Sequence, residues 1–226
     1  MKSKVILIFL ILFFAFAQYW GLVRAPADRM MGDVYRILFV HVPAAWNALL
    51  LLTVSFVGCL LYLLRRKEFW DRLAHSSMEI GLVLTGLVLP LGSLWAKPTW
   101  GVWWTWDPRL TTTMILFILY AGVLILRQLI DDPVRRAKIS SAVGLLIYLN
   151  VPIVYLSVRW WRSLHQLQSS PSTMDPQMVL ALRLNAFALL GLAVFFLVQR
   201  MRLLKREALI EEKESLPPPL PRGAQS

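Results

Sequence analysis

Residues 5–22 read VILIFLILFFAFAQYWGL, an apolar run without a charged residue whose length decides the fold class. A helix of about 20 mainly apolar residues crosses the hydrocarbon core of a bilayer. Five further largely apolar runs follow in the chain, at 44–64, 77–96, 110–129, 139–158 and 178–199. Backbone polar groups inside lipid must be satisfied within each segment, and helices achieve this. The sequence therefore predicts an all-α, polytopic membrane protein with six transmembrane helices.

The first run also resembles a cleavable signal peptide. Lys2 and Lys4 precede it, and residues 15–17 read AFA, which resembles a cleavage site. The run continues to Leu22, however, and is therefore long enough to span a bilayer. We expect a retained helix.

The composition supports a membrane location. Of the 226 residues, 58% are hydrophobic and 16% charged, and the mean hydropathy is +0.59. The one cysteine, Cys59, lies inside the second run and excludes a disulfide within one chain. The sequence has neither a C-x-x-C-H haem-attachment motif nor a G-x-x-x-x-G-K-[ST] phosphate loop. Energy from ATP would therefore have to come from a partner protein.

The net charge of +11 is unevenly distributed along the chain. Sixteen of the 24 Lys and Arg residues lie at the N-terminus, in the 65–75 and 127–138 loops and after residue 199. Cytoplasmic loops of membrane proteins carry the basic excess. We therefore expect cytoplasmic N- and C-termini. Because topology accounts for the charge, we expect no nucleic-acid partner.

The chain is predicted to have two parts. Residues 1–200 form the six-helix membrane domain. Residues 201–226 start basic, turn acidic at Glu211, Glu212 and Glu214, and end in a proline-rich stretch. Such a segment buries too little apolar surface to fold alone, so we expect a disordered cytoplasmic tail.

Tryptophan is concentrated on one predicted side of the membrane. Only Trp70 falls on the inner side. The other nine lie at or beyond the outer ends of the runs: Trp20, Trp46, Trp95, Trp100, Trp103, Trp104, Trp106, Trp160 and Trp161. Aromatic belts normally occupy both interfaces. The bias indicates a specific aromatic role on the outer face, although an enlarged belt remains an alternative.

Two histidines flank this aromatic loop on the same predicted side. Val34, Ile37, Leu38 and His41 follow the spacing of one helical face, and Pro43 allows a break before the second run. A histidine that ends an apolar stripe in this way is, taken alone, more typical of an interfacial residue than of a ligand.

His165 ends a second such stripe. It shares a helical face with Trp161 and Leu164, whereas the remaining histidine, His75, lies on the opposite side of the membrane. Haem iron takes axial imidazoles from opposite faces of the ring, and indoles stack well on planar ligands. Zinc would need three or four close donors. Two histidines around an aromatic platform therefore favour haem.

The aromatic loop itself reads WGVWWTWDPRLT at 100–111. The spacing of Trp100, Trp103 and Trp104 predicts three indoles along one side of a short interfacial helix, which Asp107 before a proline would end. Asp107 and Arg109 would form an ion pair that fixes the loop, or Arg109 would hold a haem propionate. Arg36, just over one turn before His41, is a second propionate candidate.

This loop resembles the tryptophan-rich WWD signature of haem-handling proteins in bacterial cytochrome c maturation. The segments GSLWAKP (92–98), YRILFVHVPAAW (35–46) and RWWRSLHQ (159–166) resemble one branch, the CcmC or haem exporter protein C family. The similarity covers most of residues 30–200. The sequence departs from the family pattern after His165, where Leu167 and then a Ser-Ser-Pro-Ser stretch follow.

The resemblance implies a role and a site. His41 and His165 would be axial ligands of a transient, non-covalent haem b at the periplasmic face of a bacterial inner membrane. The platform would be formed or braced by Trp95, Trp100, Trp103, Trp104 and Trp106, with Asp107 and Arg109 completing the signature.

The resemblance also implies partners. The haem would be delivered to the chaperone CcmE, with the ABC transporter subunits CcmA and CcmB and the small membrane protein CcmD, in contact with membrane lipid. The protein would be a haem delivery and transport protein and no enzyme, with lyase-like assistance of haem attachment to CcmE left open.

Three alternatives stay open. A membrane haem lyase of the same superfamily has more spans and additional intramembrane histidines. A haem-translocating transporter would show broken-helix or inverted-repeat signals. A b-type redox cytochrome pairs histidines within its helices, whereas these two are predicted at helix ends.

Overall fold

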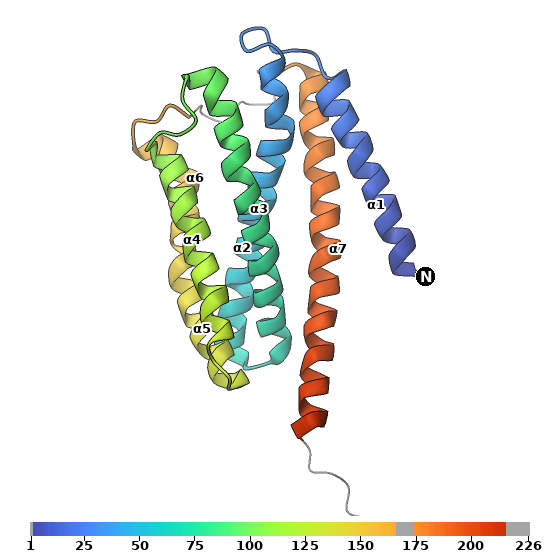
Figure 1. Cartoon of the computed structure of the whole chain (residues 1–226), viewed down its shortest axis with the longest axis vertical. Helices are drawn as coiled ribbons and strands as arrows, with labels where there is room; N and C mark the ends of the chain where they lie inside the picture. Colours follow the sequence, from blue (N-terminus) through green and yellow to red (C-terminus); the bar gives the residue numbers. More distant parts are fainter. Residues whose placement is uncertain (1, 166–173, 216–226) are drawn as a thin grey trace, which may run out of the picture.

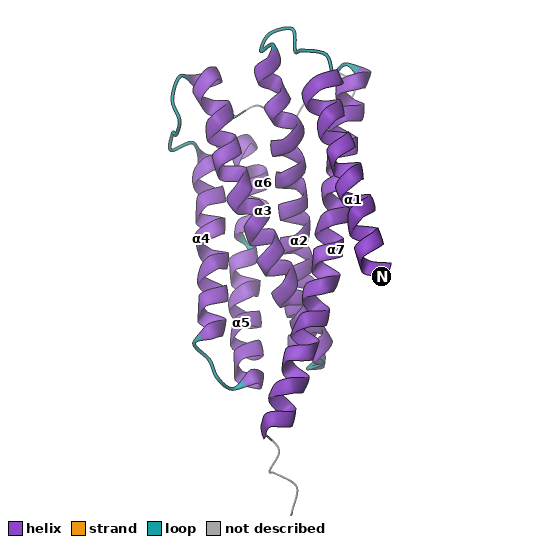
Figure 2. Ribbon diagram, turned by 45° about the vertical axis from the view of Figure 1, so that its right-hand side comes forward, coloured by secondary structure: helices purple, strands orange, loops and turns teal. Residues whose placement is uncertain are grey.

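The computed structural model describes residues 2–165 and 174–215, which form a bundle of helices (Figure 1). The helices are α1 (Lys2–Tyr19), α2 (Leu38–Arg65), α3 (Glu68–Trp100), α4 (Pro108–Gln128), α5 (Pro133–Tyr148), α6 (Asn150–Trp160) and α7 (Pro176–Ser215). A π-helical turn, η1 (Trp20–Arg24), extends α1, and a 3-10 helix, η2 (Asp33–Ile37), leads into α2. Over the described residues Figure 2 shows helices and loops throughout, as predicted.

The prediction of six transmembrane helices is confirmed for the described residues. The stretches long and apolar enough to cross a membrane are Ser3–Arg24, Asp33–Arg65, Glu68–Trp100, Pro108–Gln128, Pro133–Trp160 and Pro176–Glu211. The loops that follow η1, α3 and α6 meet at one end of the bundle, which we call the outer end (Figure 1). The opposite end, where the α2–α3 and α4–α5 connections lie, is the inner end.

Pro43 does not break its helix as expected, and the fifth span is interrupted where no break was predicted. The second span begins at Asp33 and runs through Pro43 without the expected break, because a helix in a membrane tolerates one lost N–H donor. The interruption falls instead between α5 and α6, at Leu149. Pro152 cannot donate to the ladder there, and the Asn150 side-chain amide donates to the Thr112 carbonyl at 2.9 Å.

Helix α7 is longer than the sequence predicted. It continues to Ser215, so the expected disorder is not met over residues 201–215. This stretch is rich in Leu, Lys, Arg, Glu and Ala, which favour helix even on an exposed surface. Residues 216–226 lie outside the described part, and the division into a membrane domain and a tail stays a prediction.

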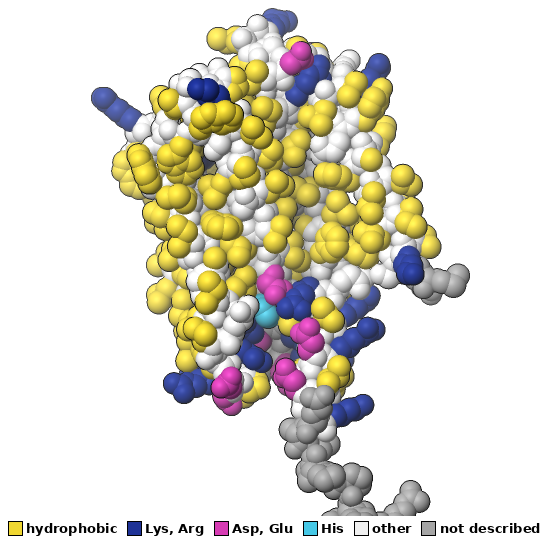
Figure 3. Space-filling view, viewed as in Figure 1, with side chains coloured by type: hydrophobic (Ala, Val, Ile, Leu, Met, Phe, Trp, Pro, Cys, Tyr) yellow, Lys and Arg dark blue, Asp and Glu magenta, His cyan; other side chains and the backbone are white. Residues whose placement is uncertain are grey.

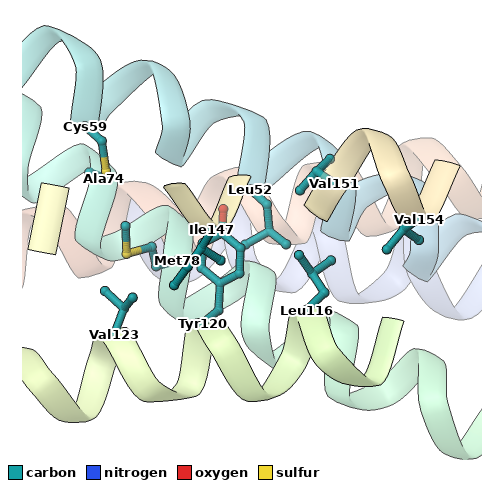
Figure 4. Packing of buried hydrophobic residues seen from close by; sticks show 10 residues of the cluster. All are labelled: Leu52, Cys59, Ala74, Met78, Leu116, Tyr120, Val123, Ile147, Val151 and Val154. Carbon is teal, nitrogen blue, oxygen red and sulfur yellow. The ribbon is translucent and has the colours of Figure 1, made fainter. Parts of the chain in front are cut away.

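The core lies between α2, α3, α4, α5 and α6. Figure 4 shows its side chains converging: Leu52, Cys59, Ala74, Met78, Leu116, Tyr120, Val123, Ile147, Val151 and Val154. Lipid tails are as apolar as these side chains, so close packing rather than removal from water holds membrane helices together. At Gly58 a Cβ would come 2.9 Å from the Ala74 backbone nitrogen, which fixes how closely α2 approaches α3.

Charged side chains are most concentrated at the inner end of the bundle. On the face in Figure 3, hydrophobic side chains cover the middle, a mixed group of acidic and basic side chains gathers at the inner end, and scattered charged side chains lie at the outer end. At that end Arg127 of α4 makes a bidentate ion pair with Asp71 of α3, at 2.8 and 2.9 Å.

Helix α1 is fastened to α7 by amides. The Gln18 side chain donates to Asn185 Oδ1 at 2.8 Å, and Asn185 donates to the Ala17 carbonyl at 2.9 Å.

Candidate functional site

A cavity lies at the outer end between α2, α3, α4 and α6, and both predicted histidines line it. His41 comes from the first turn of α2, and His165 from the loop after α6. Its polar and aromatic lining also includes Tyr35, Trp46, Trp95, Trp100, Trp104, Arg109, Thr113 and Tyr155. The remaining lining is mostly aliphatic, so the cavity suits a largely apolar ligand with a few polar contacts.

His41 is held tightly against α3. A Cβ added at Gly92 would come 3.3 Å from His41 Cε1, so this glycine leaves room for the imidazole. His41 Nδ1 is buried and has no hydrogen-bond partner among the described residues. Buried polar atoms are normally paired. An imidazole that lines a cavity and has an unpaired ring nitrogen fits a ligand-binding role.

His165 stands on an aromatic pair. Its ring centroid lies 6.2 Å from that of Trp95 and 6.3 Å from that of Trp100, and the two indoles pack edge to face at 5.3 Å. The predicted helical stripe through Trp161 and Leu164 is wrong, because α6 ends at Trp160 and Trp161 is extended. His165 therefore reaches the cavity from a loop.

The aromatic loop after α3 also differs from prediction. Helix α3 ends at Trp100, and Gly101, with φ of +78°, gives the left-handed cap. Residues 101–107 form no helix, so the expected interfacial helix with three aligned indoles is absent from this part of the structure. Trp104 joins Trp100 at the cavity.

The other two tryptophans of the loop are not part of the cavity lining. Trp103 is 56% exposed and Trp106 75% exposed, and neither lines the cavity. The Lys97 ammonium lies 6.0 Å from the Trp103 ring centroid. The signature tryptophans thus divide into an inward pair, Trp100 and Trp104, and an outward pair, Trp103 and Trp106.

Asp107 starts a helix where a helix end was predicted. It is the N-cap of α4, and its Oδ1 accepts from the Arg109 backbone N–H at 2.9 Å, with Pro108 in the first turn. The expected ion pair with the Arg109 guanidinium is absent from the described contacts. The guanidinium instead donates to the Tyr155 carbonyl at 3.0 Å. Arg109 lines the cavity, and its buried Nε has no partner among the described residues.

Arg36 does not reach the cavity. Its guanidinium pairs with Asp33 at 2.8 Å and donates to the Gly21 carbonyl at 3.4 Å. Trp46 was predicted on the outer side but not as a site residue, and it lines the cavity. The spacing of Leu38, His41, Val42 and Ala45 along one face of α2 is the signal for that wall.

The fold and the cavity define a class, a polytopic helical membrane protein with imidazoles and indoles around a cavity at one end. A family model described as heme exporter protein C matches residues 2–215. The chain therefore belongs to the heme exporter protein C (CcmC) family, and the resemblance drawn from its motifs is confirmed.

Individual relatives agree with this assignment. Heme exporter protein C of Bradyrhizobium diazoefficiens is 36% identical over 80% of this chain and 72% of its own length. The Escherichia coli K12 protein of that name is 36% identical over 81% and 75%. An Arabidopsis thaliana protein described as a putative cytochrome c biosynthesis ccmC-like mitochondrial protein is 34% identical over 91% and 82%.

Proposed function

We propose that the cavity at the outer end holds haem b non-covalently and that the protein delivers this haem to a chaperone, CcmE, during cytochrome c maturation. The observation that carries the proposal is that His41 and His165, from elements 124 residues apart in sequence, line one cavity. Both are assigned as axial ligands of the haem iron. Membership of a family described as heme exporter protein C supports haem as the cargo.

The residues around the cavity fit a porphyrin. Imidazole is a common axial ligand of haem iron. Trp95, Trp100 and Trp104 offer flat apolar surfaces, and large planar ligands pack well on indoles. Among the described residues, no group of three or more His, Cys, Asp or Glu could hold a bare metal ion. Iron that arrives inside a macrocycle needs only the two axial donors.

Arg109 is the proposed partner of a haem propionate. It lines the cavity, and its buried Nε–H lacks a protein acceptor in the described residues. A guanidinium binds a carboxylate by charge-assisted hydrogen bonds. Arg36 is dropped from this role because its guanidinium pairs with Asp33 outside the cavity.

The outward pair, Trp103 and Trp106, and the N-cap Asp107 belong to the site only indirectly. Trp103 and Trp106 are exposed beside the cavity, where they suit contact with membrane lipid or a protein partner. Asp107 is buried and shapes the loop. We assign direct haem contact to Trp95, Trp100 and Trp104 instead.

The orientation follows from charge. The basic excess at the inner end suits the cytoplasm of a bacterial cell, with both termini there and the cavity at the periplasmic face of the inner membrane. CcmA and CcmB would supply ATP hydrolysis, since this sequence has no phosphate-binding loop, and CcmD would assist. The protein acts in this proposal as a transport and delivery protein, and lyase-like assistance of haem attachment to CcmE stays the alternative.

The test is haem loading in variants of each histidine. The protein is purified in detergent with co-expressed CcmE, CcmA, CcmB and CcmD, and haem per protein and haem on CcmE are measured by absorption. His41→Ala and His165→Ala are each expected to lower both by about tenfold or more. His75→Ala is the matched control, because His75 Nε2 lies 3.3 Å from Glu79 at the inner end. Normal loading and delivery by both cavity variants would overturn the ligand assignment.

A further inference from the structure

The loop that carries His165 has no helix to hold it, because α6 ends five residues earlier at Trp160. Its described hydrogen bonds lead instead to Asp107, which is 6% exposed. Asp107 Oδ2 accepts from the Ser163 hydroxyl at 2.7 Å and from the Leu164 backbone N–H at 2.8 Å. The His165 backbone N–H in turn donates to the Ser163 hydroxyl oxygen at 3.0 Å.

One carboxylate therefore joins two loops of the outer end. Its Oδ1 caps α4 through the Arg109 backbone N–H, while Oδ2 takes both donors from the 163–164 segment. An ionised carboxylate has acceptor capacity on both oxygens, and bonds to it are stronger than neutral ones. We call this set of bonds, Asp107 with Ser163, Leu164 and the His165 backbone, the Asp107 clamp.

A second Asp-Pro pair in the chain serves as a comparison with Asp107, because the bonds described for it only cap a helix. Asp132 precedes Pro133 at the start of α5, and its Oδ1 accepts from the Arg135 backbone N–H at 2.6 Å. Asp132 is exposed, and the bonds described for it stay within α5. Helix capping alone thus accounts for Asp132 but leaves the burial and the second oxygen of Asp107 unexplained.

We propose that Asp107 is a positioning residue that sets the backbone of His165, so that the imidazole packs against Trp95 and Trp100 and lines the same cavity as His41. This inference rests on the proposed function insofar as His165 binds haem iron. It makes no use of a contact between Asp107 and haem. Residues that orient a metal ligand typically change metal affinity 10- to 100-fold when they are removed.

The first experiment is independent of haem. Amide hydrogen exchange is followed in the full-length, haem-free protein in detergent for wild type, Asp107→Asn, Ser163→Ala and the control Asp132→Asn. Asparagine still caps a helix but has one acceptor oxygen, so Asp107→Asn loses part of the clamp. We expect exchange of the Leu164 and His165 amides to rise about tenfold in Asp107→Asn, less in Ser163→Ala, and to stay at the wild-type rate in Asp132→Asn. Unchanged exchange in Asp107→Asn would overturn the clamp.

The second experiment reads the haem ligand in the complex co-expressed with the Ccm partners. Asp107→Asn is expected to bind haem about 10- to 100-fold more weakly and to shift the absorption spectrum from six-coordinate towards five-coordinate iron. Added imidazole should restore the six-coordinate spectrum, which a general folding defect would not permit. Combined with His165→Ala, Asp107→Asn should cause no further loss. An additive loss, or a spectrum that imidazole leaves unchanged, would show that Asp107 does not act through His165.

The two experiments separate the two ideas. A wild-type spectrum in His165→Ala would refute the ligand role of His165, while the exchange rates would still decide whether the clamp exists. A perturbed His165→Ala spectrum with normal Asp107→Asn exchange and binding would refute the positioning role alone. If Asp107→Asn fails to fold, Ser163→Ala replaces it in both experiments, because this change leaves the α4 cap intact.

Discussion

The two ends of the bundle use arginine and histidine in opposite ways. At the inner end Arg127 is paired on both nitrogens with Asp71, and His75 lies 3.3 Å from Glu79. At the outer end Arg109 Nε and His41 Nδ1 are buried without a hydrogen-bond partner among the described residues. Polar groups that hydrogen-bond to one another stabilise a fold, whereas buried polar groups without a partner beside a cavity are typical of a binding site. Arg127 and His75 therefore indicate structure at the inner end, whereas Arg109 and His41 indicate binding at the outer end.

The largest expected effect lies at the inner end and concerns stability. Asp71→Asn removes the charge opposite Arg127, whose side chain is 7% exposed. Breaking a buried ion pair from one side costs about 3–5 kcal/mol because the remaining charge is left uncompensated. We expect a clearly lower unfolding temperature in detergent, measured by calorimetry or tryptophan fluorescence. Haem bound per folded protein should not change, and a loss of haem without destabilisation would break the comparison.

Arg109→Gln should show the reverse pattern at the outer end. Loss of one charged hydrogen bond to a propionate costs about 1.5–3 kcal/mol, so haem affinity should fall about tenfold or more. The unfolding temperature of the haem-free protein should stay close to wild type, since the guanidinium makes one described hydrogen bond, to the Tyr155 carbonyl. Arg36→Gln is the control, and an equal loss of haem there would point to a general electrostatic effect.

Gly92→Ala tests whether the close contact with Gly92 sets the position of the His41 imidazole. The new methyl group would lie 3.3 Å from His41 Cε1, a tighter contact than most Cβ atoms make, so the imidazole has to shift by a few tenths of an ångström. Overpacking of this kind costs about 1–3 kcal/mol. We expect the shifted imidazole to bind haem iron less well, which would give a weaker and altered haem absorption spectrum. Gly122→Ala in α4 is the matched control, because a Cβ there meets no atom within 4 Å. A spectrum unchanged in Gly92→Ala would remove His41 from the ligand set.

The smallest effect should separate the inward from the outward tryptophans. Trp100→Phe shrinks a ring that lines the cavity and contacts His165, and aromatic contacts contribute about 0.5–1.5 kcal/mol each. Trp106→Phe changes a side chain that is 75% exposed. Titration of haem into both variants should give a severalfold loss of affinity in the first and a smaller loss in the second, because the Trp106 ring reaches the cavity only through its contact with Trp104, at 6.0 Å between ring centroids. Equal losses would place both indoles in the platform.

Much of this architecture could be predicted from the sequence. Long apolar runs determine helices in a membrane almost unaided, so all six spans were predicted, with errors at their ends and at the interruption of the fifth span at Leu149. The two histidines were correctly placed on one side because six spans put alternate loops together. Their opening onto one cavity depends on how the first turn of α2 and His165 are placed in the folded bundle, which no local pattern specifies.

The errors occur where a local pattern has two physical solutions. Trp100, Trp103 and Trp104 have helical spacing, but Gly101 allows a left-handed cap and the helix ends there. Asp107 before proline fits the end of one helix as well as the start of the next. Its bonds to Ser163 and Leu164 span more than 50 residues and carry no sequence signal.

The interruption at Leu149 has a consequence for how the outer wall is built. Helix α6 has 11 residues, about 16 Å, and its ladder does not continue that of α5. At this point the Asn150 side-chain amide donates to the Thr112 carbonyl of α4, so the start of the upper segment is fastened to a neighbouring helix where its own ladder is interrupted.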